Sequence, residues 1–121
     1  MGLFDFASNV SETFETNQNN SLKTHYYKDR YINIKQIVIN YAKANKITVR
    51  SEDDVHGEIY LQTGSYHMIV SILQVTPLET AVDIKVQTYR IIGLFKPVKL
   101  ILNMFSHISS KSSFKGVGLH P

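Results

Sequence analysis

Four strand-like stretches lie in the middle of the chain, at residues 47–51, 58–63, 66–76 and 80–90: the first is short, the third is rich in β-forming residues throughout, and the second and fourth alternate apolar with polar residues. Such alternation is typical of β-strands that bury one face. Gly64-Ser65 separates the second and third stretches, and a turn containing Pro77 separates the third and fourth. Connections this short join antiparallel strands, so the pattern predicts a four-stranded antiparallel sheet.

Helical spacing flanks the strands on both sides. Apolar residues recur every three or four positions in residues 26–45 and 93–111, which predicts one helix before the strands and one after them. The same spacing in residues 1–16 predicts a short amphipathic helix, followed by a polar linker to residue 21. The predicted fold class is therefore α+β: a four-stranded antiparallel sheet packed on one face by two helices (α-ββββ-α), preceded by a short N-terminal amphipathic helix.

This order divides the chain into three parts. We expect residues 1–21 to form the N-terminal helix and its linker, residues 22–110 the α-ββββ-α domain, and residues 111–121 a flexible tail, because the tail lacks apolar periodicity.

The third strand differs from the fourth in having apolar residues on both sides. Val82 and Ile84 alternate with Asp83 and Lys85, so the fourth strand presents one apolar side to the helices. On the third strand, Met68, Val70 and Ile72 are apolar on that side, and Ile69, Leu73 and Val75 are apolar on the opposite side. Burying one large aliphatic side chain is worth about 1.5–3 kcal/mol, so we expect a cover over the second set. The N-terminal helix, a second copy of the chain and an apolar ligand are the alternatives.

The composition restricts the chemistry. The 121 residues include no cysteine, which excludes disulfides, thiol nucleophiles and thiolate metal sites. The five histidines lack the spacing of a helical or strand metal pair, and no G-x-S-x-G or phosphate-binding loop is present. We therefore expect no enzymatic activity, no metal and no cofactor.

The charge is unevenly distributed. The net charge of +3 combines an acidic N-terminal segment, an acidic cluster at 52–58 and a stretch after Asp83 in which every charged residue is basic. These regions of opposite sign could attract one another within or between chains. The most apolar stretch, 91–108, is interrupted by Lys96 and Lys99, so we expect no transmembrane segment and a cytoplasmic protein.

Several stretches together carry a resemblance to known domains. They are Gln62-Thr63-Gly64-Ser65, the strand 66–76 with its Thr76-Pro77-Leu78 turn, the strand 81–88 and the closing helix through 101–108. In this pattern the chain resembles small bacterial cytosolic domains of uncharacterised function, and half of a helix-grip or TATA-box-binding-type fold. The resemblance implies an antiparallel sheet wrapped around a long helix, in folds that bind apolar ligands, nucleic acid or partner chains.

Three functions follow from these patterns. The first is a non-enzymatic interaction module that self-associates through the apolar sheet face (Ile69, Leu73, Val75) or through the N-terminal helix (Leu3, Phe6, Val10, Phe14). The second is a carrier of a small apolar ligand, held between the sheet and the C-terminal helix near Ile101 and Phe105. The third is nucleic-acid binding, which the basic C-terminal third favours and the absence of a recognition motif disfavours.

Overall fold

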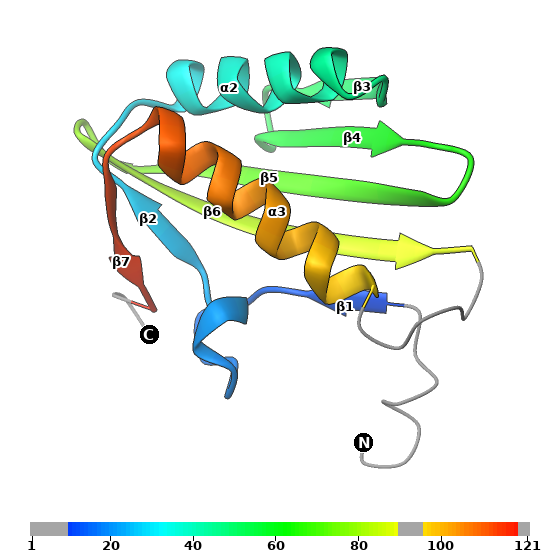
Figure 1. Cartoon of the computed structure of the whole chain (residues 1–121). Coiled ribbons are helices and arrows are strands. Elements are labelled where there is room, and N and C mark those ends of the chain that lie inside the picture. Colours follow the sequence, from blue (N-terminus) through cyan, green and yellow to red (C-terminus); the bar gives the residue numbers. More distant parts are fainter. Residues whose placement is uncertain (1–9, 90–95, 119–121) are drawn as a thin grey trace.

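In the part of the chain that the structure describes, a seven-stranded antiparallel sheet carries two α-helices on one face (Figure 1). The computed structural model describes residues 10–89 and 96–118. The strands are β1 (Val10–Glu12), β2 (His25–Tyr27), β3 (Thr48–Asp53), β4 (Glu58–Gln62), β5 (Tyr66–Thr76), β6 (Glu79–Thr88) and β7 (Phe114–Val117). The helices are α2 (Tyr31–Ala44), α3 (Lys96–Lys111) and a 3-10 turn, η1 (Asn20–Leu22).

The strand order is β3-β4-β5-β6-β2-β7, and β1 also pairs with β6. Strand β6 thus has β5 along one side and two short strands along the other. Val10–Glu12 pair with residues 85–87, and His25–Tyr27 pair with residues 80–82. The two short strands therefore follow one another along the same side of β6, and the intervening residues 13–24 form an excursion between them.

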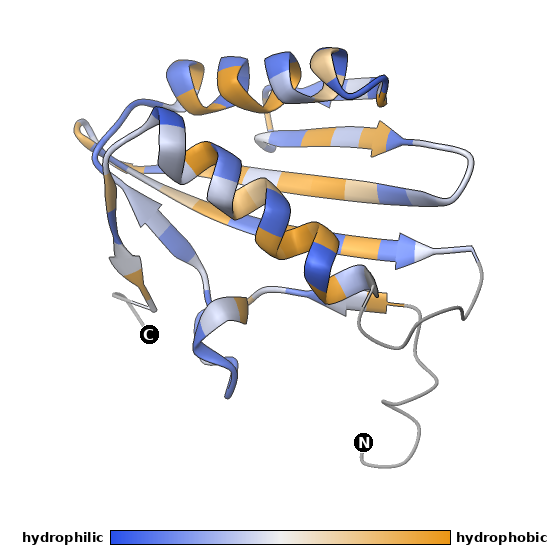
Figure 2. Ribbon diagram, in the orientation of Figure 1, coloured by the Kyte–Doolittle hydropathy of each residue, from blue (hydrophilic) through white to orange (hydrophobic). Residues whose placement is uncertain are grey.

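The core lies between the helices and one side of the sheet, here called the inner face. Helix α2 buries Ile34, Val38 and Ala42, as its apolar spacing predicts, and α3 buries Ile101, Met104, Phe105 and Ile108. On the inner face, β5 and β6 contribute Met68, Val70, Ile72, Val82, Ile84 and Val86. The inward sets predicted for both strands are buried as expected, and Figure 2 shows apolar positions in orange along β5 and β6.

Helix α2 begins five residues later than predicted. Tyr26 and Tyr27 belong to β2, where they are held between β6 and β7. The Gln74 side-chain oxygen accepts the Tyr31 N–H (2.7 Å), and the Asp29 carboxylate accepts hydrogen bonds from the backbone of Arg30 and the side chain of Asn33. Gln74 thereby satisfies the first backbone N–H of the helix, which has no partner within the helix, and Asp29 fixes the turn that precedes it.

The prediction of only four strands is wrong. Val10, expected on an amphipathic helix, lies on β1, and Phe14 lies in the turn that follows, so no helix continues through residues 10–16. The remainder of that predicted helix lies outside the described residues. The segment expected to be a flexible tail contributes β7, which pairs with β2. In each case an open strand edge supplies backbone hydrogen-bond partners that the apolar spacing did not indicate.

Candidate functional site

The face of the sheet opposite the helices, here called the outer face, bears Ile69, Leu73 and Val75 on β5 and Asp83, Lys85 and Gln87 on β6. Neither described helix covers this face. Leu73 is 66% exposed and Val75 is 41% exposed, whereas Val70 and Ile72 on the same strand are buried. Both edges of the sheet are short or irregular: β7 has four residues and β3 is bulged between Val49 and Ser51. Such edges disfavour edge-to-edge pairing, so the outer face is the candidate surface.

Asp83 on β6 links the two ends of the excursion formed by residues 13–24. Its Oδ1 accepts the hydroxyls of Thr13 (2.6 Å) and Thr24 (2.8 Å), which lie at the two ends of that excursion. Thr13 also takes the place of a strand residue, because its N–H donates to the Ile84 carbonyl and its Oγ1 accepts the Ile84 N–H, both at 2.8 Å. These bonds fasten both ends of the excursion to β6, while its 3-10 turn lies on the helix side of the sheet, where Leu22 packs against the core.

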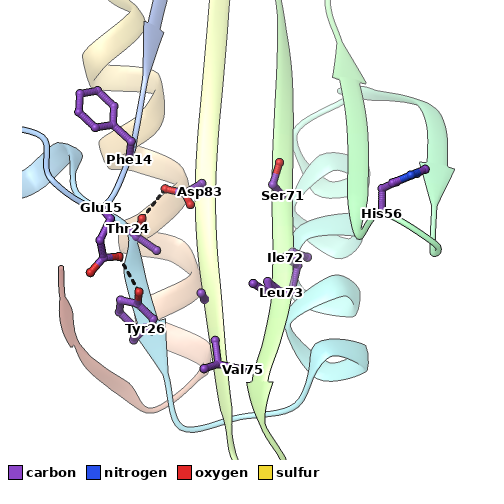
Figure 3. Close-up of a pocket in the computed structure, with 11 residues that line it drawn as sticks. Phe14, Glu15, Thr24, Tyr26, His56, Ser71, Ile72, Leu73, Val75 and Asp83 are labelled. Carbon is purple, nitrogen blue, oxygen red and sulfur yellow. Dashed lines mark hydrogen bonds between the residues drawn. The ribbon is translucent and has the colours of Figure 1, made fainter. Parts of the chain in front are cut away.

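An open groove of about 550 Å³ lies between the excursion and β5 (Figure 3). Ala81, which stands between Leu73 on β5 and Tyr26 on β2 in the strand register, is the small residue at its floor. Phe14, which is 48% exposed, also lines the groove, together with Leu73 and Val75. The groove is therefore apolar at the end lined by Leu73 and Val75, and Phe14 lies toward its other end, beyond Glu15 and Asp83 (Figure 3).

The other end of the groove is acidic. Glu15 accepts a hydrogen bond from the Tyr26 hydroxyl (2.5 Å). Burial of Tyr26 is the larger cause that raises the pKa of its phenol, and this hydrogen bond is the next. Burial also raises the pKa of the Asp83 carboxyl, against the lowering effect of the two threonine hydroxyls, with Glu15 and Glu12 adding repulsion. A second hollow of about 270 Å³ continues from Asp83 past Glu58 and Lys85.

A row of residues crosses the outer face from edge to edge. The register aligns Tyr60 on β4, Ile69 on β5, Lys85 on β6 and Glu12 on β1. Arg50 extends the row at the other edge, because it is the bulged residue between Val49 and Ser51, and Ser51 pairs with Tyr60. Arg50 lines an open hollow of about 340 Å³ together with Lys46, Thr48 and Gln62. One end of the row is therefore basic and the other acidic.

His56 lies in the β3–β4 hairpin at the rim of the groove. Its Nδ1 lies 2.7 Å from Asp53 Oδ2, and this hydrogen bond raises the pKa of the imidazole. The carboxylate also accepts the backbone N–H groups of Val55 and His56, so it shapes the hairpin turn. Figure 3 shows the His56 ring directed away from β5 and from Ser71. The arrangement fits a turn-stabilising pair better than a base positioned beside a nucleophile.

Within residues 10–89 and 96–118, no group of three or more histidine or carboxylate side chains is arranged to hold a metal ion. Neither helix of that part of the chain is long and apolar enough to cross a membrane.

The structure places the predicted site residues in three groups. Ile69, Leu73 and Val75 lie on the outer face, joined by Phe14 at the groove and by Val10 on β1. Ile101 and Phe105 lie in the core instead, where they are 0% and 3% exposed. Leu3 and Phe6 lie outside the described residues.

Neighbouring side chains fill the space around Ile101 and Phe105. The Phe105 ring stacks on His25 at 3.5 Å between centroids, and burial lowers the pKa of that histidine. A ligand at the position predicted between the sheet and α3 would have to displace packed side chains.

Sequence reasoning missed the residues that build the groove, namely Ala81, Tyr26, Glu15 and the Thr13–Asp83–Thr24 cluster. Thr13 and Thr24 lie 70 and 59 residues from Asp83 in the chain, so no local spacing links them. The one available signal was a small residue, Ala81, on the outward side of a strand otherwise rich in larger residues.

In comparisons with known proteins, no family model matches the chain and no curated protein matches it in sequence. The resemblance to helix-grip and TATA-box-binding-type folds therefore stays a prediction, and function must be argued from the outer face itself.

Proposed function

We propose that this protein is a non-enzymatic interaction module that self-associates by packing the outer faces of two copies against each other. The carrying observation is the row Arg50–Tyr60–Ile69–Lys85–Glu12, with exposed Leu73 beside it on the central strand. Two sheets commonly pack face to face about 10 Å apart with strands nearly aligned.

The row is complementary to itself under a two-fold rotation about an axis parallel to β5. Such a rotation places Arg50 of one copy opposite Glu12 of the other, and Tyr60 opposite Lys85. These pairs are an ion pair and a cation–π contact, and each occurs twice. Ile69 and Leu73, on the central strand, meet their own equivalents. This self-complementarity is what an isologous dimer requires.

One neighbouring row acts against association at neutral pH. The register aligns Glu58, Ser71 and Asp83, so the same rotation places Glu58 opposite Asp83. Two facing carboxylates repel one another, and burial already raises the pKa of Asp83. We therefore expect association to tighten as the pH falls, because protonation of Asp83 removes the repulsion while Arg50 keeps its charge.

Sedimentation equilibrium over a range of protein concentrations tests the proposal. Leu73→Lys places a charge at the centre of the contact and should weaken dimer formation at least about tenfold, since an unpaired buried charge costs several kcal/mol. Ile32→Lys is the matched control, because Ile32 is 60% exposed on α2, away from the outer face. A chain that stays monomeric at every concentration contradicts the proposal, as does equal weakening by both variants.

A mixing experiment tests the arrangement of the two copies. Arg50→Glu and Glu12→Lys should each weaken the homodimer, because each creates two like-charge pairs. An equimolar mixture of the two variants should recover association, since the introduced glutamate then faces the introduced lysine, while the unchanged Arg50 and Glu12 meet at the second contact. Lys43→Glu, on the exposed side of α2, controls for the change in net charge. A mixture no tighter than either variant alone would rule out this arrangement.

A further inference from the structure

The groove between the excursion and β5 is not explained by self-association, because a single chain builds all of it. Its floor is Ala81, Leu73 and Val75 line one end, and Phe14 lies toward the other end. A volume of about 550 Å³ lies within the range of small-molecule sites, about 300–1,000 Å³. The apolar end therefore has room for a short alkyl chain or an aromatic ring.

The polar end determines the charge of the occupant. The described residues that line the groove include two carboxylates, Glu15 and Asp83, and no lysine or arginine. Asp83 Oδ1 accepts both threonine hydroxyls, whereas Oδ2 accepts no hydrogen bond from the described residues. Burial disfavours the charged form of Asp83, and Glu12 and Glu15 add repulsion. A cation placed beside Oδ2 would relieve both effects.

Among the remaining titratable groups near the groove, Lys85 and His56 act in the opposite direction, and His56 at the rim is hydrogen-bonded to Asp53. Glu58 lines the adjoining hollow, and so does Lys85, which is the single described cation there. Lys85 occupies the next row along β6 and makes no ion pair with the described residues. The potential at the Asp83 end is therefore set mainly by carboxylates.

We propose that this groove binds a small organic amine, with its alkyl or aryl group over Ala81 between Tyr26 and Leu73, and its ammonium group at Asp83 Oδ2. The proposal differs from the apolar carrier expected between sheet and helix in its location and in the charge it requires. It does not depend on self-association. An occupied groove and a facing second copy use overlapping surface, so amine and dimer compete.

The experiment uses three eight-carbon probes, n-octylammonium, n-octanol and octanoate, each below its micelle concentration. Binding is followed by backbone NMR shifts of the full chain carrying Arg50→Glu, a change outside the groove that should keep the chain monomeric. We expect octylammonium to bind about tenfold more tightly than octanol, and octanoate to bind most weakly. Shifts should centre on Tyr26, Leu73 and Ala81.

Two variants separate the contributions of charge and shape. Asp83→Asn should remove the preference for amine over alcohol while leaving octanol binding unchanged within about twofold. Ala81→Leu should fill the floor and weaken all three probes. Equal binding of octanoate and octylammonium, a preference that survives Asp83→Asn, or shifts on another surface would overturn the proposal. Failure of the mixing experiment above would leave these results unaffected, so the two proposals can be judged separately.

Discussion

Strand β5 carries large apolar residues on both faces, in different surroundings, whereas its neighbour β6 is apolar mainly on the inner face. On the inner face, Val70 and Ile84 are 0% and 1% exposed beneath the helices. On the outer face, Leu73 is 66% exposed, and Asp83 lies half-buried among threonine hydroxyls. The difference shows that alternation tells which residues share a face, while the cover over that face depends on the rest of the chain or on another molecule.

The largest expected effects contrast one residue from each face. Ile84→Ala removes a side chain from the core and should lower the free energy of unfolding by about 2–5 kcal/mol. Leu73→Ala should change it by less than about 0.5 kcal/mol in the monomer, because its side chain is mostly in water. Urea unfolding followed by far-ultraviolet circular dichroism, at a concentration where the chain is monomeric, measures both values.

Equal losses for the two variants would show that Leu73 is already covered within one chain. That result would mean that a segment of the same chain covers the outer face, and it would contradict the contrast between an exposed Leu73 and a buried Ile84. In sedimentation equilibrium the order of the two variants should reverse. Leu73→Ala should weaken association more than Ile84→Ala does, and more than a control substitution at Ile32 on α2.

The elements with long, regular patterns were predictable. The third predicted strand has the bounds of β5, Tyr66–Thr76, and the spacing of Ile34, Val38 and Ala42 correctly placed the buried stripe of α2. Strands β1, β2 and β7 were not predictable, because three or four residues carry too little periodicity. Their existence depends on partners far along the chain: Tyr27 pairs with both Thr80 and Phe114.

The site was predictable only in its apolar half. Ile69, Leu73 and Val75 follow from alternation on one strand, which the local sequence contains. Asp83 appears in the sequence as an ordinary outward polar residue. Its role emerges only in the folded chain, where the pairing of β1 and β2 with β6 brings Thr13 and Thr24 to its carboxylate. The groove depends on the same long-range pairing.

Two glycines extend the contrast between packed and open positions. Gly57 has φ +68°, and a Cβ added there would lie 2.1 Å from the Ile72 carbonyl oxygen, whereas one added at Gly64 meets nothing within 4 Å. Gly57→Ala should therefore cost at least about 1–2 kcal/mol for the left-handed conformation alone, and more for the backbone contact. Gly64→Ala should be close to neutral. Comparable urea midpoints for the two variants would contradict the hairpin geometry that brings Gly57 against β5.

The smallest expected effect concerns Asp83, the polar residue that the outer face partly buries. Burial raises the pKa of its carboxyl above the ordinary value of 3.8, so the ionised form destabilises the folded chain at neutral pH. As the pH falls through the folded-state pKa, the folded chain takes up the proton before the unfolded chain does. This contribution to stability therefore grows until the pH reaches the unfolded value near 3.8.

Other carboxylates change stability in the opposite direction, so the measurement must isolate Asp83. Burial would raise the pKa of Asp29, but hydrogen bonds from Ser112, Asn33 and the Arg30 backbone outweigh it and lower that pKa, so its contribution is lost in acid. The difference in unfolding free energy between the native chain and Asp83→Asn cancels Asp29 and the other shared groups. That difference should shift in favour of the native chain between about pH 7 and pH 4. A shift in the opposite direction would mean that the two threonine hydroxyls outweigh burial, and that Asp83 is better stabilised as an anion on the outer face than in water.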